Sequence, residues 1–184
     1  MIKPFLTIVL TSALSASVMA SEFSLHSKDI KAGEYMPKAQ EFSGFGCDGD
    51  DTSPHLVWKN APKGTKSFAI TAYDPDAPTG SGWWHWQLIN IPADITRLKA
   101  GAGASNGESL PEGSMHIQND YGVAAFGGAC PPVGHGDHRY QFTVHALSVE
   151  KLELAENVSG ALAGYMIKAN AIESVTLEAL YRRD

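Results

Sequence analysis

Several segments of the chain alternate apolar and polar side chains with a period of two residues. In RYQFTVHAL, for example, Tyr140, Phe142 and Val144 fall on one face and the residues between them on the other. An extended strand places alternate side chains on one face, so this pattern predicts strands with one buried face. With 18 Gly and 10 Pro as turn residues, it predicts a mostly β protein of one domain. The expected strands are Phe23–Ser27, Pro54–Trp58, Lys66–Tyr73, Trp84–Asn90, Arg139–Leu147 and Val175–Tyr181.

Helices are expected only at the periphery. The alanine-rich segment SGALAGYMIKANA, at about 159–171, predicts a helix with Ser159 or Asn157 as its N-cap. A second, short helix is expected at 149–154. The residues whose spacing predicts the apolar face of the longer helix are Leu162, Met166 and Ala169.

The first twenty residues have the pattern of an export signal. Lys3 precedes an apolar run that ends in the small-residue cleavage site VMA at 18–20. The run is short and rich in Ser and Thr for a membrane span, although an uncleaved anchor is the alternative. We therefore expect a periplasmic protein, with release outside the cell as the alternative, whose mature chain, 21–184, is a single domain.

The charge of the chain restricts its partners. It carries 14 Lys and Arg against 20 Asp and Glu, a formal net charge of −6, and it has no basic run. Nucleic acid and anionic lipid surfaces are therefore unexpected partners. Outside the first twenty residues no segment is long and apolar enough to span a bilayer, so an integral membrane protein is not expected.

The two cysteines, Cys47 and Cys130, both lie in Gly-rich segments. Two cysteines in an exported chain favour a disulfide, which would close a loop of about 83 residues. A Cys–Cys metal site is a weaker alternative because the CxxC spacing is missing, and two inert thiols are a third. We expect no metal and no cofactor.

Three polar loops contain residue types suited to a binding or catalytic site. YDPDAP, directly after a predicted strand, supplies Asp74 and Asp76. GSGWWHW supplies His85, and the Gly-rich loop 127–140 supplies His138. Neighbouring carboxylates repel each other unless a donor is near, and the two histidines are the candidate donors. The alternatives are turn formation for each aspartate and a structural position for His85.

The tryptophans around His85 predict an aromatic pocket. Period two places Trp84 and Trp86 on one face of the strand and His85 on the other, where the YDPDAP loop is expected to arrive. We expect these two indoles, together with Pro131 and Pro132, to form the pocket wall.

The loop 127–140 suits an anion better than a metal. Its glycines let backbone N–H groups approach a ligand closely, and its prolines stiffen it. His135 and His138 have a spacing that allows a zinc site, but further ligands are missing, and His135 is expected to be exposed. The chain has no GxSxG, HExxH or phosphate-loop motif, so no hydrolytic nucleophile is evident.

DPDAP, GSGWWHW and PPxGxGxHRY together resemble motifs of the phosphatidylethanolamine-binding proteins, also called Raf kinase inhibitor-like proteins, and of their bacterial branch in particular. The resemblance extends over nearly all of 21–184 and includes SPHLVW and PKGTKSF. It implies two antiparallel β-sheets with peripheral helices and a small pocket for phosphate or phosphorylated headgroups. The pocket residues that it implies are Asp74, Asp76, His85, the backbone of Gly128, His138 and Tyr140.

The resemblance also implies how the protein acts. Family members usually bind rather than catalyse, and bacterial members are often dimers, which implies a homodimer. The leading hypothesis is an exported, non-enzymatic binder of anionic or zwitterionic ligands such as phosphoethanolamine, which could regulate or inhibit another protein. In this hypothesis the histidines hold the phosphate and Asp74 or Asp76 faces the ammonium. The alternatives are a hydrolase that uses the Asp/His cluster and an interaction protein that acts through its surface.

Overall fold

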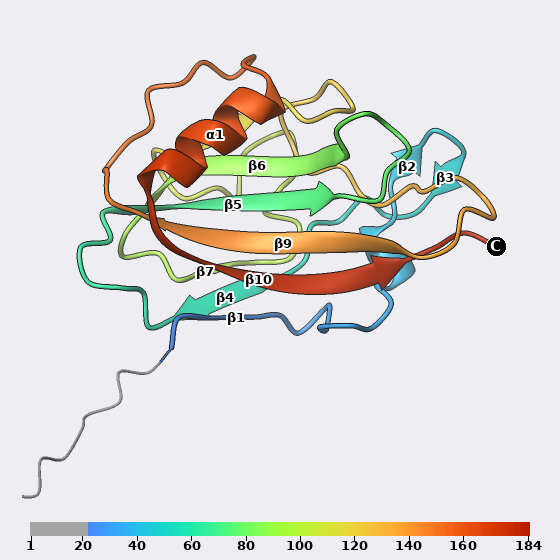
Figure 1. Cartoon of the computed structure of the whole chain (residues 1–184), viewed down its shortest axis with the longest axis horizontal. Coiled ribbons are helices and arrows are strands. Elements are labelled where there is room, and N and C mark those ends of the chain that lie inside the picture. Colours follow the sequence, from blue (N-terminus) through green and yellow to red (C-terminus); the bar gives the residue numbers. More distant parts are fainter. Residues whose placement is uncertain (1–21) are drawn as a thin grey trace, which may run out of the picture.

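The computed structural model describes residues 22–184, and the predicted export signal at 1–20 lies outside the described residues. In this part of the chain, two antiparallel sheets pack face to face (Figure 1). The larger sheet has the strand order β10-β9-β5-β6-β8, and the smaller sheet has the order β1-β4-β7. The elements are β1 (Ser24–His26), the 3-10 helix η1 (Lys38–Gln40), β2 (Ser43–Gly44), β3 (Cys47–Asp48), β4 (Leu56–Lys59), β5 (Ser67–Asp74), β6 (Trp83–Pro92), β7 (Arg97–Leu98), β8 (Met115–Ile117), β9 (His138–Leu147), α1 (Gly160–Asn170) and β10 (Ala171–Tyr181).

The core lies between the two sheets, where the alternating side chains point. From the smaller sheet, Trp58 is fully buried and meets the ring of Phe68 edge-on, with ring centroids 5.4 Å apart. Each large apolar side chain buried here stabilises the fold by about 1.5–3 kcal/mol. The mostly antiparallel β fold expected from the sequence is therefore confirmed. The inward-facing residues of β5 and β9 are Phe68, Ile70, Ala72, Tyr140, Phe142, Val144 and Ala146.

One predicted helix is confirmed and the other is wrong. The helix α1 follows Ser159, whose side-chain oxygen accepts the N–H of Leu162 at 3.1 Å as an N-cap. Residues 149–154 form no helix, because the side chain of Asn90 binds the backbone of Leu152 instead. The Leu152 N–H donates to Asn90 Oδ1 at 2.8 Å, and Asn90 Nδ2 donates to the Leu152 carbonyl at 3.3 Å.

The helix α1 covers the outer face of the larger sheet, but with a different face from the predicted one (Figure 1). Ala163 and Ile167 are buried there, whereas Leu162 is 45% exposed. A Cβ at Gly160 would lie 2.6 Å from the ring of Trp84, so the glycine lets this side of the helix approach the sheet. The predicted face residues that remain exposed or half-buried are Leu162, Met166 and Ala169.

The strand β6 departs from period two at His85. Ala72 of β5 pairs with Trp86 and the next residue of β5 pairs with Trp84, so His85 is an extra residue in a β-bulge. The bulge turns His85 toward Tyr140 on the inner face, with ring centroids 5.1 Å apart, while Trp84 packs on the outer face beneath α1. The prediction that Trp84 and Trp86 share one face opposite His85 is therefore wrong.

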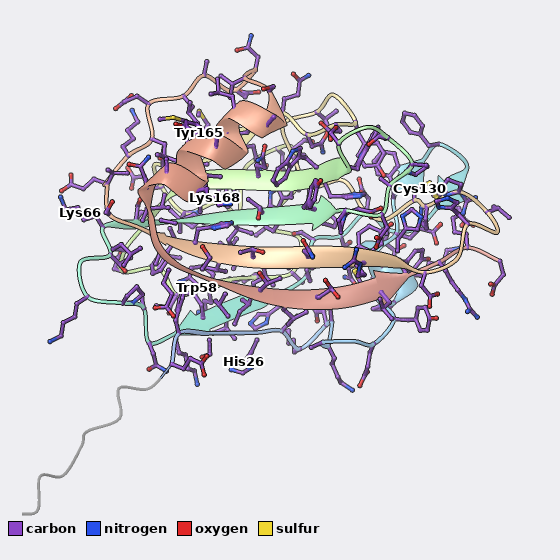
Figure 2. All side chains as sticks on the ribbon, viewed as in Figure 1. His26, Trp58, Lys66, Cys130, Tyr165 and Lys168 are labelled. Carbon is purple, nitrogen blue, oxygen red and sulfur yellow. A yellow bond between two sulfur atoms is a disulfide. The ribbon has the colours of Figure 1, made fainter. Side chains whose placement is uncertain are left out.

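The predicted disulfide between Cys47 and Cys130 is confirmed, with a sulfur–sulfur distance of 1.99 Å. It joins the β2–β3 hairpin to the loop that precedes β9, and Figure 2 places Cys130 at this end of the molecule. Arg183 joins the same two segments by donating to the carbonyls of Gly46, at 2.6 Å, and Pro131, at 3.4 Å. Across residues 22–184, no helix has the length and apolar character needed to cross a membrane.

Candidate functional site

A cavity of about 180 Å³ opens where β5 ends and β6 and β9 begin. This is the end of the larger sheet at which the β2–β3 hairpin lies (Figure 1). Because the three strands are neighbours and antiparallel, residues from three distant parts of the sequence meet at one edge. Of the residues predicted for the site, those that line the cavity are Asp74, His85, Cys130, Pro131, Pro132, His138 and Tyr140.

Asp74 and His138 form a buried pair in the cavity wall. Asp74 ends β5 and is 2% exposed, and His138 begins the neighbouring strand β9 and is 1% exposed. His138 Nδ1 lies 2.7 Å from Asp74 Oδ2, and the backbone N–H of Asp76 donates to Asp74 Oδ1 at 2.8 Å. Both carboxylate oxygens of Asp74 therefore already accept a hydrogen bond within the protein.

His85 is held with one ring nitrogen engaged and the other without a partner. Its Nδ1 lies 2.8 Å from the carbonyl oxygen of Gly127, and because a carbonyl only accepts, Nδ1 must carry a proton. Its Nε2 is buried and has no hydrogen-bond partner among the described residues. Burial lowers the pKa of His85, so an anion at Nε2 would favour the protonated ring, which the desolvated site otherwise disfavours.

Two further lining side chains carry buried polar atoms without a partner in the described part of the chain, the hydroxyl of Tyr140 and Nε1 of Trp83. Burial raises the pKa of Tyr140, so its hydroxyl keeps its proton and can donate. Indole Nε1 only donates, and a protonated His85 would donate from Nε2. Leaving such groups unpaired costs free energy, which a ligand that accepts hydrogen bonds would recover.

Asp76 does not line the cavity, contrary to the prediction. Its carboxylate is engaged by Arg139, whose Nε and NH2 donate to it at 2.9 and 2.7 Å and whose backbone N–H donates at 2.9 Å. The hydrogen bonds from Arg139 lower the pKa of Asp76 to about 2. The structure therefore gives Asp76 the role of anchoring the start of β9 to the loop after β5.

The predicted backbone donor at Gly128 is also engaged elsewhere. Its N–H donates to Asp51 Oδ1 at 2.6 Å, and Gly128 is outside the cavity lining. A Cβ at this position would lie 2.5 Å from the carbonyl oxygen of Gln40, so the glycine is required for close backbone packing. The glycine is therefore needed for packing at this position, whereas the prediction assigned its backbone N–H to contact with an anion.

The predicted indole walls are wrong as well, because the bulge at His85 moves the neighbouring side chains. Trp86 is fully buried in the core, and Trp84 lies beneath α1, so neither lines the cavity. The indole that does line it is Trp83, one residue earlier in the same stretch.

His135 has a partner that the sequence did not predict. It is exposed, as expected, yet its Nδ1 lies 2.7 Å from Nε2 of the buried His138. The two rings therefore bind each other, and both ring nitrogens of His138, one bound by His135 and one by Asp74, are unavailable to the zinc of the alternative. Within residues 22–184, no group of three or more His, Cys, Asp or Glu side chains is placed to hold a metal.

Sequence reasoning missed several apolar and aromatic lining residues that come from loops. Tyr121 lines the cavity and stacks on Phe42, with ring centroids 4.0 Å apart, and the 77% exposed Phe45 stands at its edge. No local pattern marks Phe45 or Tyr121, because this aromatic cluster exists only after the loops meet, whereas Ala77, Pro78 and Trp83 lie in the stretches YDPDAP and GSGWWHW that the sequence had already indicated. The lining residues that were missed are Phe45, Ala77, Pro78, Thr79, Trp83 and Tyr121.

The contacts of Asp76 lead to a prediction that distinguishes a role in stability from a role in anion binding. Asp76→Asn is expected to lower the free energy of unfolding by about 1 kcal/mol, because it weakens the pairing with Arg139. It is expected to leave anion affinity unchanged, because Asp76 does not line the cavity. Urea unfolding and a phosphate titration of the same variant measure both. A large loss of phosphate affinity in a stably folded Asp76→Asn variant would show that Asp76 belongs to the binding site.

The fold and the cavity define a single-domain antiparallel β protein. It has a small pocket, lined in part by buried polar groups, at one end of its larger sheet. A family model described as phosphatidylethanolamine-binding protein matches residues 26–182. The chain is 49% identical over 179 residues to "UPF0098 protein YbcL" of Escherichia coli (strain K12), covering 97% of this chain and 98% of that protein. It is 45% identical over 157 residues to "UPF0098 protein YbhB" of the same organism, covering 85% of this chain and 98% of that protein.

The solved structures agree with these relatives. The crystal structure of E. coli YbcL, described as a new member of the mammalian PEBP family, superposes with a TM-score of 0.88 at 52% sequence identity. The match covers 89% of this chain and 100% of that chain. The chain therefore belongs to the phosphatidylethanolamine-binding protein family.

Proposed function

We propose that the protein is a non-enzymatic binding protein whose pocket holds phosphate or the phosphoryl end of a phosphorylated headgroup such as phosphoethanolamine. One observation carries this proposal. Three side chains of a single small cavity, Trp83, His85 and Tyr140, each present a buried polar atom without a protein partner. All three can donate a hydrogen bond, and a tetrahedral oxyanion offers acceptors in several directions.

The same geometry supports recognition of the anion rather than of an attached ammonium group. The oxygens of Asp74 are bound by His138 and by the N–H of Asp76, and the carboxylate of Asp76 is bound by Arg139. Neither aspartate is placed to receive an ammonium in the way the sequence suggested. We therefore propose that phosphoethanolamine binds through its phosphate, with its amine directed toward the opening.

The geometry supports binding over hydrolysis. Asp74 is 2% exposed with both oxygens engaged, so it is poorly placed as a base for an attacking water. Cys130, the one lining residue that could have offered a thiol, is in a disulfide with Cys47. Of the polar atoms that remain for a ligand, Trp83 Nε1 and the Tyr140 hydroxyl donate, and His85 Nε2 donates once the ring is protonated, which suits binding of an oxyanion.

Calorimetric titration with inorganic phosphate, phosphoethanolamine and ethanolamine tests the proposal. Phosphate and phosphoethanolamine are expected to bind with similar affinity, and ethanolamine is expected not to bind. His85→Ala is expected to weaken both phosphates about tenfold to a hundredfold, because it removes a charge-assisted hydrogen bond. His26→Ala is the matched control, since His26 is an exposed histidine on β1 that Figure 2 places well apart from Cys130. Absence of phosphate binding by the folded wild-type protein would refute the proposal.

We further propose that the protein is exported to the periplasm, that it forms a homodimer, and that it regulates another protein. The disulfide between Cys47 and Cys130 supports an oxidising compartment, and the pattern of residues 1–20 supports removal of an export signal. The dimer rests on the resemblance to bacterial family members, and the protein target rests on the resemblance to eukaryotic ones. Cell fractionation with mass spectrometry of the mature N-terminus tests export, light scattering tests the dimer, and pull-down with purified protein tests the target.

A further inference from the structure

We propose that His135 lets the buried His138 carry a proton, and that the resulting change in charge of the cavity wall sets the pH range in which the protein binds anions. This inference rests on the proposed anion-binding function. It concerns a side chain that lies outside the cavity lining and acts through the ring of His138.

Asp74, His138 and His135 form a continuous chain of hydrogen bonds from the cavity wall to the surface. Asp74 Oδ2 lies 2.7 Å from His138 Nδ1, and His138 Nε2 lies 2.7 Å from His135 Nδ1. A carboxylate accepts, so His138 Nδ1 carries a proton in every state of the chain. Between the two rings there is room for one proton only, because the other nitrogen of that hydrogen bond must accept it.

This arrangement allows the two rings to take up one proton together without breaking the bond. In the neutral state, His135 Nδ1–H donates to His138 Nε2. The added proton binds His135 Nε2, the ring nitrogen of the pair that takes no part in these hydrogen bonds. The charge then lies on His135, or on His138 once the shared proton shifts to His138 Nε2 and His135 Nδ1 accepts it. With an ionised Asp74, the chain changes from a net charge of −1 to 0 when the proton is added. An anion entering the cavity meets less repulsion in the second state, so anion binding is coupled to uptake of this proton.

His135 is needed because His138 has no access to water. His138 is 1% exposed, and an imidazolium N–H without an acceptor there would be strongly disfavoured. The loop holds His135 in place for this role. The N–H of Gly134 donates to the carbonyl of Arg183 at 2.9 Å, and the N–H of His135 donates to the carbonyl of Pro132 at 3.1 Å.

The charged side chains around this chain of hydrogen bonds have partners of their own. Asp76 is paired with Arg139, and Asp137 accepts the hydroxyl of Tyr35 at 2.8 Å and lies 3.8 Å from Arg182. The charged and titratable groups that face the chain from neighbouring elements are His85 on β6, Asp76 on the loop after β5, Tyr121 on the loop after β8, Asp137, Arg139 and Tyr140 on and before β9, Tyr181 on β10, and Arg182 after it.

Sulfate is the probe for this inference, since its own charge does not change between about pH 5 and pH 8, where histidine titrates. In calorimetric titrations across this range, the wild type is expected to bind sulfate more tightly as the pH falls and to take up protons on binding. His135→Leu removes the acceptor and is expected to weaken sulfate binding near pH 7 about tenfold or more, with its pH profile displaced to lower pH. His135→Gln supplies an oxygen that can accept from His138 Nε2, and it is expected to restore most of the affinity.

A control variant and the results that would contradict this inference complete the test. His26→Leu, a change at an exposed histidine on β1, is expected to keep the wild-type profile. If His135→Leu keeps the wild-type affinity and profile, or if His135→Gln is as impaired as His135→Leu, this inference is wrong while the proposed function stands. If the wild type binds phosphate but binds sulfate at no pH in the range, this inference is wrong while the proposed function stands. If it binds neither anion, the proposed function fails, and this inference fails with it.

Discussion

Replacing Cys47 and Cys130 together by alanine is expected to lower the free energy of unfolding by roughly 4 kcal/mol. The disulfide joins residues separated by 83 positions, so it removes a large loop-closure entropy from the unfolded chain. In the folded state, the bond joins the β2–β3 hairpin to the cavity wall, since Cys130 is one of the lining residues. The effect is large for a chain of this size, because domains are commonly stable by only about 5–15 kcal/mol.

Urea unfolding of the double alanine variant, compared with the oxidised and the reduced wild type, measures this effect. The reduced wild type is expected to match the variant, and a reductant is expected to leave the variant unchanged. Arg183→Gln is an informative control, because Arg183 joins the same two segments only by hydrogen bonds in the folded state. That change is expected to cost about 1 kcal/mol. A loss below about 1 kcal/mol in the double variant would contradict the loop-entropy account.

Stability is expected to fall steeply as the pH drops from about 6.5 to about 4, by roughly 6 kcal/mol in total. Burial lowers the pKa of His116 and of His145, each to about 4. Between these values and the ordinary histidine pKa, the unfolded chain binds more protons than the folded one. Each histidine therefore contributes about 3 kcal/mol that is present above about pH 6.5 and lost as the pH falls through about 4. His85, whose pKa burial also lowers, acts in the same direction.

Urea unfolding at a series of pH values tests this expectation. His116→Gln is expected to show a shallower pH dependence than the wild type, and His26→Gln, at an exposed position, is expected to keep the wild-type slope. Asp76 does not interfere in this range. Its pKa is lowered to about 2, so its stabilising effect is present above the ordinary carboxyl pKa and is lost only at more acidic pH. A free energy of unfolding that stays constant from about pH 6.5 to about 4 would show that the folded protein does not lower the pKa of these histidines.

The anion-binding predictions and the stability predictions act in opposite directions with pH. Protonation of His85 and of the chain of Asp74, His138 and His135 favours an anion in the cavity, while protonation of His116 and His145 unfolds the protein. A bound anion would therefore stabilise the folded state most in mildly acidic solution.

The part of the site that the sequence predicted consists of residues next to strongly patterned strands. Asp74, His85, His138 and Tyr140 lie at the ends of β5, β6 and β9, and they meet because these strands are neighbours in one sheet. The residues that the prediction placed wrongly depend on a partner far away in the sequence. The carboxylate of Asp76, for example, is bound by Arg139, which lies 63 positions later in the sequence.

Local chemistry determined the long strands, the helix with a cap at Ser159 or Asn157, and the Cys47–Cys130 pair. Side-chain alternation, capping residues and the number of cysteines can all be read from short segments or simple totals. Only the tertiary structure decided which way His85 points, since its bulge comes from pairing with β5 rather than from its neighbours in the chain. The contact of His135 with His138 also required the folded loop. Such features depend on the register and packing of elements distant in sequence, and a single sequence does not contain those distances.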